Sequence, residues 1–197
     1  MIAVTITGGL GGCSGSGSEP EAAPTASRSR ALFGRSCESR VYGRLGGGWR
    51  SRSLVVGPIA FVGASGYSGY RPRGLAGGGR HHVVKILVVV ASSQTVTVEV
   101  APRAAARASL AYDPGNLDPG RVDRGQPAVT FSACPEGTPL TSRSGTQFHG
   151  GLIVSEPGCV PLLVHLSGSG PPLRTAVSVG AGRCFAADAL SRRVNPR

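Results

Sequence analysis

The stretch KILVVVASSQTVTVEV, residues 85–100, decides the fold class. Its first part, Lys85–Val90, is a continuous apolar run, as expected of a strand that is covered on both faces. Its last part, Thr95–Val100, alternates Thr or Glu with Val, which is the period-two pattern of a half-buried strand. The short polar segment Ala91–Gln94 predicts a hairpin connection between them.

Similar strand patterns occur on both sides of this stretch. Gly57-Pro58 interrupts the apolar run that begins at Ser53, which suits an edge strand or a bulge. Short strands separated by turns, with no convincing amphipathic helix, predict an all-β fold, a sandwich or a barrel. We favour a β-sandwich, immunoglobulin-like or similar, of about seven or eight strands. The further predicted strands are Ser53–Val62, Ala108–Tyr112, Ala128–Cys134, Gln147–Val154, Val160–Leu166 and Arg174–Val179.

The composition agrees with one domain of this kind and a tail. The chain has 197 residues, with 31 Gly, 15 Pro and only 5% aromatic residues. Gly raises the entropy cost of a helix and Pro removes a backbone donor from it, so a helical bundle is disfavoured. We expect a flexible linker over residues 14–48, with order beginning near Cys37 or Trp49, and the sandwich over residues 49–184, including a long loop at 63–82. A C-terminal tail is expected over residues 185–197.

The N-terminal residues 1–13 resemble the signal of a bacterial lipoprotein. The small residues Leu10-Gly11-Gly12 precede Cys13, the residue that lipidation would modify, and a Gly/Ser/Pro/Ala-rich spacer follows it. No Lys or Arg precedes the short apolar stretch, so either translation starts upstream of Met1 or the match is a chance one; we favour the first. No run of 18 apolar residues occurs, so no transmembrane helix is predicted.

The positive charge is concentrated ahead of the most strand-like part of the chain. The net charge is +11, of which residues 27–80, with ten Arg and one acid, supply +9. Such a segment can bind nucleic acid, anionic lipid or an acidic wall polymer. The nearby aromatic residues follow no known nucleotide-binding pattern, so we expect an anionic envelope surface or wall polymer and no nucleic acid. These aromatic residues are Tyr42, Trp49, Tyr67 and Tyr70.

Four cysteines besides Cys13 predict two disulfides. No pair has C-x-x-C spacing, which disfavours zinc and thioredoxin-type sites and favours folding in an oxidising compartment. Four cysteines allow three pairings. We predict Cys134–Cys159, because these residues bracket one strand, and by elimination Cys37–Cys184. The alternative is four unpaired buried thiols in a cytoplasmic protein.

The motif that stands out most is Gly63–Gly69, which follows the apolar Ile59–Val62. It resembles the glycine-rich turn of N-acetyl-glutamyl-phosphate reductases and related dinucleotide-binding enzymes, but that site requires a following helix. The next residues, Tyr70–Gly74, include Pro and Gly, so we interpret the motif as a loop. Ser65 and Ser68 also miss the G-x-S-x-G spacing of serine hydrolases.

The histidines and acids form no recognisable catalytic or metal site. His149 and His165 are the available bases, but nothing in the sequence places either beside a serine, and Gly150 after His149 indicates a bulge. The neighbours His81 and His82 would point to opposite faces of a strand. Asp113, Asp118 and Asp123 belong to turns and do not fit a calcium loop. No catalytic residue, metal, cofactor or small-molecule ligand is therefore predicted.

Several phrases between residues 49 and 184 together resemble a family of uncharacterised exported proteins, lipoproteins among them, of high-GC Gram-positive bacteria. The family has no assigned activity, so the resemblance implies export and fold alone. Our first hypothesis is a non-catalytic extracytoplasmic domain, secreted or anchored to the membrane by a lipid, that binds a cell-envelope component. The alternative is an extracellular enzyme, for which His149 is the first candidate. The phrases are WRSRSLVVGPIAFVG, KILVVV, TVTVEV, AYDP, AVTFSAC, TQFHGGLIVSEPGCVPL and SVGAGRC.

Overall fold

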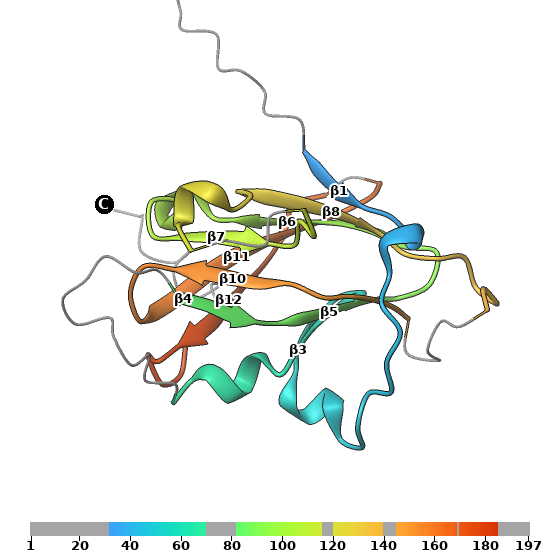
Figure 1. Ribbon diagram of the computed structural model, residues 1–197, viewed down its shortest axis with the longest axis horizontal. Helices are drawn as coiled ribbons and strands as arrows, with labels where there is room; N and C mark the ends of the chain where they lie inside the picture. The colour runs from blue at the N-terminus through green and yellow to red at the C-terminus, as the bar shows by residue number, and fades with distance from the viewer. Residues whose placement is uncertain (1–31, 70–81, 116–119, 140–144, 169, 185–197) are drawn as a thin grey trace, which may run out of the picture. The chain divides into compact units, whose positions relative to one another are not determined.

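The computed structural model describes residues 32–69, 82–115, 120–139, 145–168 and 170–184 (Figure 1). Within these ranges the regular structure is β-strands and short 3-10 helices. The strands are β1 (Phe33–Arg35), β2 (Leu54–Val56), β3 (Ile59–Val62), β4 (His82–Lys85), β5 (Leu87–Val90), β6 (Thr95–Val100), β7 (Ala108–Ala111), β8 (Ala128–Ser132), β9 (Thr146–Phe148), β10 (Gly151–Val154), β11 (Gly158–Leu166) and β12 (Leu173–Val179). The helices are η1 (Cys37–Ser39), η2 (Trp49–Arg52), η3 (Ala64–Tyr67), η4 (Pro102–Ala104) and η5 (Val122–Arg124).

The first layer is a five-stranded sheet in the order β1-β8-β6-β11-β12. All neighbouring strands in it are antiparallel except β1, which runs parallel to β8. The alternation in Thr95–Val100 places Val96, Val98 and Val100 in the core and the Thr and Glu side chains on the other face. The period-two pattern of the sequence therefore sets which face of this sheet is buried.

The second layer consists of two sheets that continue into one another, β2-β3-β5-β9 and β4-β10-β7. Only Ile86 separates β4 from β5, and its N–H donates to the carbonyl of Gly150, which lies between β9 and β10. At Gly150 a Cβ would overlap the ring of Tyr112, and at Gly151 it would overlap the carbonyl oxygen of Val84. These two glycines let neighbouring backbone and side chains approach where the sheet bends.

The core fills the space between the two layers and draws on all three sheets. Its centre is aromatic: the rings of Tyr112 and Phe131 meet edge to face at 5.0 Å, and Phe131 lies 5.2 Å from Phe148. The Tyr112 hydroxyl donates to the carbonyl of Ile86 over 2.9 Å, which satisfies a polar group inside the core. The all-β, sandwich-like architecture predicted from the sequence is confirmed.

The predicted hairpin between Lys85–Val90 and Thr95–Val100 is wrong. β5 pairs with β3 and β9 in the second layer, whereas β6 pairs with β8 and β11 in the first. The segment 91–94 crosses from one layer to the other, because the apolar side chains of both strands must face one core. Ser93, whose φ is 61°, donates its N–H to the carbonyl of Cys134 at this crossing.

Two other predicted strands are each divided in the structure. Gly57-Pro58 is the tight turn of a β2–β3 hairpin, with Gly57 at a φ of 53°, rather than a bulge, and β2 is the edge strand of its sheet. The segment Gln147–Val154 splits into β9 and β10 on either side of His149-Gly150. In both segments the residues on either side of the break are largely apolar, so the glycines, Gly57 and Gly150, were the main sequence signal that one predicted strand is in fact two.

The domain begins well before Trp49, so the predicted linker over residues 14–48 is wrong from Phe33 onward. Phe33, Gly34 and Arg35 pair with residues 129–131 of β8, and Val41 bridges to Gln147. Residues 14–31 and the predicted tail at 185–197 lie outside the described residues. Three residues of sequence FGR carry no strand pattern, and their place in the sheet comes from long-range contacts.

Arg35 explains why this N-terminal segment is held so firmly. Its side chain is only 3% exposed and donates to the backbone carbonyls of Tyr112 (2.5 Å), Ser39 (2.5 Å) and His149 (3.5 Å), and to the hydroxyl of Ser39. Its guanidinium also lies 5.8 Å from the centre of the Phe148 ring. Burial lowers the pKa of Arg35, and the nearby Asp113 opposes this effect.

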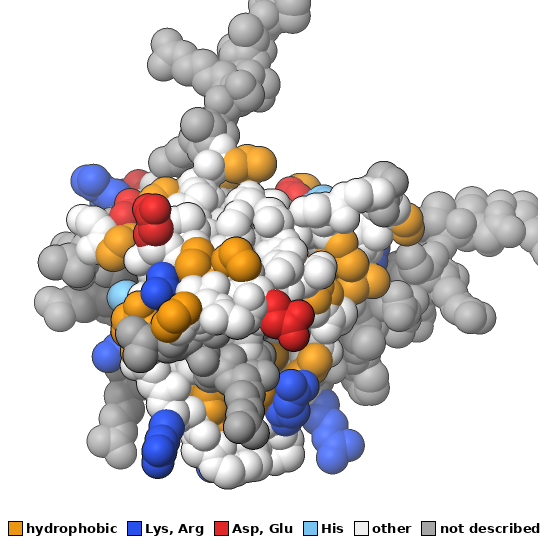
Figure 2. Space-filling model, turned by 90° about the vertical axis from the view of Figure 1, so that its right-hand side faces the viewer, with side chains coloured by type: hydrophobic (Ala, Val, Ile, Leu, Met, Phe, Trp, Pro, Cys, Tyr) orange, Lys and Arg blue, Asp and Glu red, His pale blue; other side chains and the backbone are white. Residues whose placement is uncertain are grey.

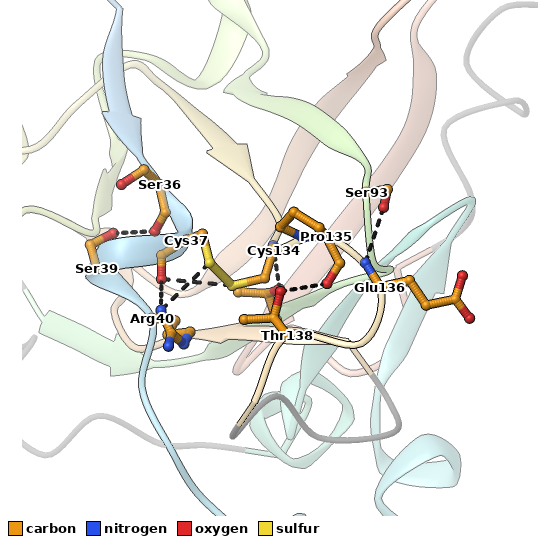
Figure 3. Close-up of a disulfide and its surroundings, with 10 residues drawn as sticks. Ser36, Cys37, Ser39, Arg40, Ser93, Cys134, Pro135, Glu136 and Thr138 are labelled. Carbon is orange, nitrogen blue, oxygen red and sulfur yellow. Dashed lines mark hydrogen bonds between the residues drawn. A yellow bond between two sulfur atoms is a disulfide. The ribbon is translucent and has the colours of Figure 1, made fainter.

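The four cysteines form two disulfides, as predicted, but the predicted pairing is wrong. The bonds are Cys37–Cys134 and Cys159–Cys184, in place of Cys134–Cys159 and Cys37–Cys184. Figure 3 shows Cys37, in η1, bonded to Cys134 in the segment that follows β8. Because β1 lies against β8, the residues that follow the two strands are brought together, which the spacing of the cysteines alone did not reveal.

Candidate functional site

The outer face of the first layer is polar and open. Thr95, Thr97 and Glu99 of β6 lie on this face, beside Thr130 and Ser132 of β8. The hydroxyl oxygens of Thr97 and Thr130 lie 2.8 Å apart, and the Thr95 and Ser132 hydroxyls lie 3.4 Å apart. The hydroxyls thus form a row across two strands in which each can still accept or donate a bond to a ligand.

An acid–base pair continues this row onto β11. Nε2 of His165 lies 2.9 Å from Oε2 of Glu99, and the two side chains are 41% and 33% exposed. The pair bridges two neighbouring strands, because His165 is opposite Thr97 and Glu99 is opposite Leu163 in the register. A carboxylate in this position orients the imidazole ring and leaves its other nitrogen for solvent or a ligand.

A cleft of about 230 Å³ lies at one end of the same face. Its floor is largely apolar, and one arginine lies on each side: Arg103 from η4 and Arg174 from β12. η4 starts with Pro102, and the next residue, Arg103, lines the cleft. The lining residues are Ala101, Pro102, Arg103, Pro161, Leu162, Leu163 and Arg174. We call the cleft, together with the Glu99–His165 pair and the hydroxyl row, the polar face.

The register explains how residues so distant in sequence share this cleft. Leu163 is opposite Glu99 on one side and opposite Arg174 on the other, so the three strands present Glu99, Leu163 and Arg174 in one row. Arg103 and Arg174 are exposed, and in the part of the chain that the structure describes neither makes a hydrogen bond or ion pair. Two unpaired guanidinium groups beside an apolar floor fit an anionic ligand with a less polar body, because the guanidinium fork matches carboxylate and phosphate.

The glycine-rich motif does not form the start of a long helix within the described residues. Ala64–Tyr67 is a single 3-10 turn, and the residues after Gly69 up to His81 lie outside the described ranges. Ser65 lies on this turn and Ser68 directly follows it, and the Ser68 hydroxyl donates to the carbonyl of Ser65 over 3.1 Å rather than to a histidine. The motif is therefore a turn between β3 and the next described strand.

The three histidines that the structure describes lie apart from one another. His149 is exposed between β9 and β10 in the second layer, where its carbonyl accepts a bond from Arg35, while His165 lies on the first layer. His82 is on β4, with Nε2 buried and without a hydrogen-bond partner, and His81 lies outside the described residues. Among the described residues no three His, Cys, Asp or Glu are grouped to hold a metal ion.

The aspartates act in turns and at the surface. The carboxylate of Asp113 accepts the N–H of Gly115 over 2.8 Å, which is a local turn bond. Asp123 pairs with Arg121 in the exposed η5 segment, and this bond lowers the pKa of Asp123. Asp118, like Cys13, lies outside the described residues.

Neither Arg103 nor Arg174 was predicted as a site residue from the sequence. His165 was considered only as an available base with no predicted neighbours. The signal available was the polar half of the Thr95–Val100 alternation, Thr95, Thr97 and Glu99, which marks an exposed polar face. No pattern in one strand reveals its neighbours, so the cleft required the register of β6, β11 and β12.

Two further findings bear on where and how the protein works. The two disulfides indicate that it folds in an oxidising, extracytoplasmic environment. Among the described residues, no helix has the length and apolar character needed to cross a bilayer. Comparison of the chain with protein-family models, with curated proteins and with solved structures found no match.

Proposed function

We propose that this chain is a non-catalytic extracytoplasmic domain that binds an anionic component of the cell envelope at the polar face. The observation that carries the proposal is the pair of unpaired arginines, Arg103 and Arg174, on either side of an open cleft. Each exposed guanidinium group, Arg103 on η4 and Arg174 on β12, is free to bind a carboxylate or phosphate group through its fork of N–H donors. The hydroxyl row and the Glu99–His165 pair extend the surface along β6 and β11, as an elongated polymer would require.

The resemblance to exported proteins and lipoproteins supports the location that this proposal needs. A lipid on Cys13 would hold the domain close to the membrane, with residues 14–31 as the spacer. Intact mass measured on protein from its native host tests this part. We expect acyl mass on an N-terminal Cys13, and four other cysteines that become alkylated only after reduction. An unmodified N-terminus at Met1 with free thiols contradicts it.

An extracellular enzyme is the second candidate, and one observation favours it. The Glu99–His165 pair lies at 2.9 Å beside the cleft, as a general base and the carboxylate that orients it would. Such a pair still needs a nucleophile or an activated water within reach, and no described Ser or Cys donates to His165. Conversion of a wall fragment by the protein, abolished by His165→Gln, would replace the binding proposal with this one.

The binding proposal is tested with polymers of defined charge. We would measure binding to polygalacturonate (a carboxylate polymer), to a glycerol-phosphate polymer and to neutral dextran by isothermal titration calorimetry. Each arginine lost should weaken binding about tenfold, since a hydrogen bond to a charged group contributes about 1.5 kcal/mol. Arg103→Gln/Arg174→Gln should therefore reduce affinity for an acidic polymer about a hundredfold.

The matched control removes the same charge elsewhere. Arg121→Gln/Arg124→Gln changes two arginines at the exposed η5 segment and should alter affinity only through the net charge, by less than about threefold at 0.15 M salt. Equal losses in the two double variants would show that attraction is non-specific. Absence of binding to both acidic polymers would refute the proposal.

A further inference from the structure

A second exposed surface lies where the edges of the two layers meet. The side chains of Leu166 and Leu173 remain 42% and 37% exposed at the end of the β11–β12 hairpin. The β2–β3 turn approaches them: a Cβ on Gly57 would lie 2.9 Å from Cδ1 of Leu173 and 4.0 Å from Cδ1 of Leu166. The leucines therefore form the far side of a continuous surface that includes this turn.

The near side of that surface is formed by η2 and β2. Trp49, Arg50, Val55 and Gly57 line one small shallow pocket of about 90 Å³, and the Val55 side chain is 48% exposed. The guanidinium of Arg50 lies 4.9 Å from the centre of the indole ring of Trp49. We define the rim patch as the six residues Trp49, Arg50, Arg52, Val55, Leu166 and Leu173.

Charge in this part of the molecule has one sign. Between Glu38 and Glu99 the sequence contains no Asp or Glu, although it contains Arg40, Arg44, Arg50, Arg52 and other basic residues. This stretch supplies β2, β3, β4, β5 and η2. The edge of the second layer that adjoins the rim patch therefore attracts anions and has no carboxylate of its own strands to oppose that attraction.

We propose that the rim patch rests on the surface of an anionic lipid bilayer. Tryptophan prefers the interface of a bilayer, where the ring lies among the headgroups, and arginine binds lipid phosphate while its stem contacts apolar atoms. Val55, Leu166 and Leu173 supply apolar side chains that reach the acyl boundary. Arg50 and Arg52, which follow Trp49 in η2, supply the charge.

The size of the patch favours a bilayer over a protein partner. Its apolar side chains are few and each is about half exposed, whereas a stable protein interface buries a contiguous apolar core. On the face in Figure 2, hydrophobic side chains lie in small groups among polar ones, and Lys and Arg side chains are scattered, several of them along the lower edge. The patch therefore suits shallow contact with a lipid surface, to which each of its side chains contributes separately.

The inference is independent of the polymer site and is tested separately. The full chain carrying Cys13→Ser, which has no residue for acylation at that position, is mixed with vesicles of 30% phosphatidylglycerol in phosphatidylcholine. Binding is measured by sedimentation and by the shift of Trp49 fluorescence, which is specific because the chain has one Trp. We expect a blue shift and salt-sensitive binding to these vesicles, and none to pure phosphatidylcholine.

Three variants separate the contributions. Arg50→Gln/Arg52→Gln should weaken vesicle binding about thirtyfold, since each arginine near an anionic leaflet contributes about fivefold. Val55→Ser/Leu173→Ser should abolish the blue shift. The matched control Arg121→Gln/Arg124→Gln, with the same change in net charge, should retain binding within about threefold of the parent, and circular dichroism should show all three folded.

Two outcomes overturn the inference. One is the absence of sedimentation with anionic vesicles, and the other is an equal loss in the Arg50/Arg52 and Arg121/Arg124 variants. Either result, obtained while the acidic polymers still bind at the polar face, refutes the membrane contact without affecting the polymer proposal. If the acidic polymers do not bind but the anionic vesicles do, the polymer proposal is refuted and the membrane contact stands.

Discussion

Removing the Cys37–Cys134 disulfide is expected to destabilise the domain more than removing Cys159–Cys184. The first bond joins residues 97 apart in the sequence, and the second joins residues 25 apart. A disulfide restricts the unfolded chain more when the loop that it closes is longer. The chain-entropy relation gives about 4.7 kcal/mol for the longer loop and about 3.5 kcal/mol for the shorter, a difference of about 1.2 kcal/mol.

The packing of the longer bond adds to this difference. Cys134 is fully buried beside the core, so Cys37→Ala/Cys134→Ala also leaves a small cavity, which costs about 1 kcal/mol. We therefore expect a loss of about 5–6 kcal/mol for this double variant and about 3.5 kcal/mol for Cys159→Ala/Cys184→Ala. The first loss is comparable with the whole free energy of unfolding of many domains.

Urea unfolding, followed by circular dichroism, measures both losses. The unfolding free energy and the slope with denaturant are compared for the parent and the two double-alanine variants, and the slope should rise in both because the unfolded chains expand. Hydrogen exchange should additionally become faster in residues 33–43 of the Cys37→Ala/Cys134→Ala variant. An equal or larger loss in the Cys159→Ala/Cys184→Ala variant would refute the reasoning from loop length.

Three more predictions concern the core and its edges. Arg35→Met should cost about 3–5 kcal/mol in urea unfolding, because it leaves buried carbonyls without donors, whereas the exposed Arg174→Met should cost less than about 0.5 kcal/mol. Burial raises the pKa of Tyr112, so its neutral hydroxyl contributes its full stabilisation below the ordinary tyrosine pKa of 10.0, and this stabilisation is lost as the pH rises above that value. Tyr112→Phe should therefore reduce the fall in unfolding free energy above pH 10.0, as measured by urea unfolding at a series of pH values. Gly150→Ala should lower the melting temperature by more than about 10 °C through its overlap with Tyr112, while Gly34→Ala, with no atom near the added carbon, should change it by less than about 2 °C.

Local patterns predicted the strands well, because the order of apolar and polar residues within a strand reflects which of its faces are buried. Thr95–Val100 was predicted with the bounds that the structure has, and its alternating residues do separate core from surface. The partners of each strand were predicted less well. A run such as Leu87–Val90 shows only that both faces are covered, and the sequence does not distinguish a neighbour in the same sheet from one in the opposite layer.

The parts that the sequence did not reveal depend on contacts between distant residues. The sequence Phe33–Arg35 has no strand pattern of its own. It is held as a strand by pairing with β8 and by the bonds that Arg35 donates to the carbonyls of Tyr112 and His149. Arg103 and Arg174 similarly become one site only through the register of three strands. The disulfide pairing failed for the same reason, because it follows the parallel pairing of β1 with β8.

The parallel pairing of β1 with β8 affects the order in which the two disulfides form during secretion. For a chain that leaves a translocation channel N-terminus first, β1 appears early and waits without a partner until residues near Val129 arrive. Cys37 meets Cys134 before Cys159 or Cys184 has emerged, and these two then pair with each other. With Cys13 acylated, as proposed above, an oxidase that joins the remaining cysteines in their order of arrival produces the native bonds directly, with no rearrangement by an isomerase.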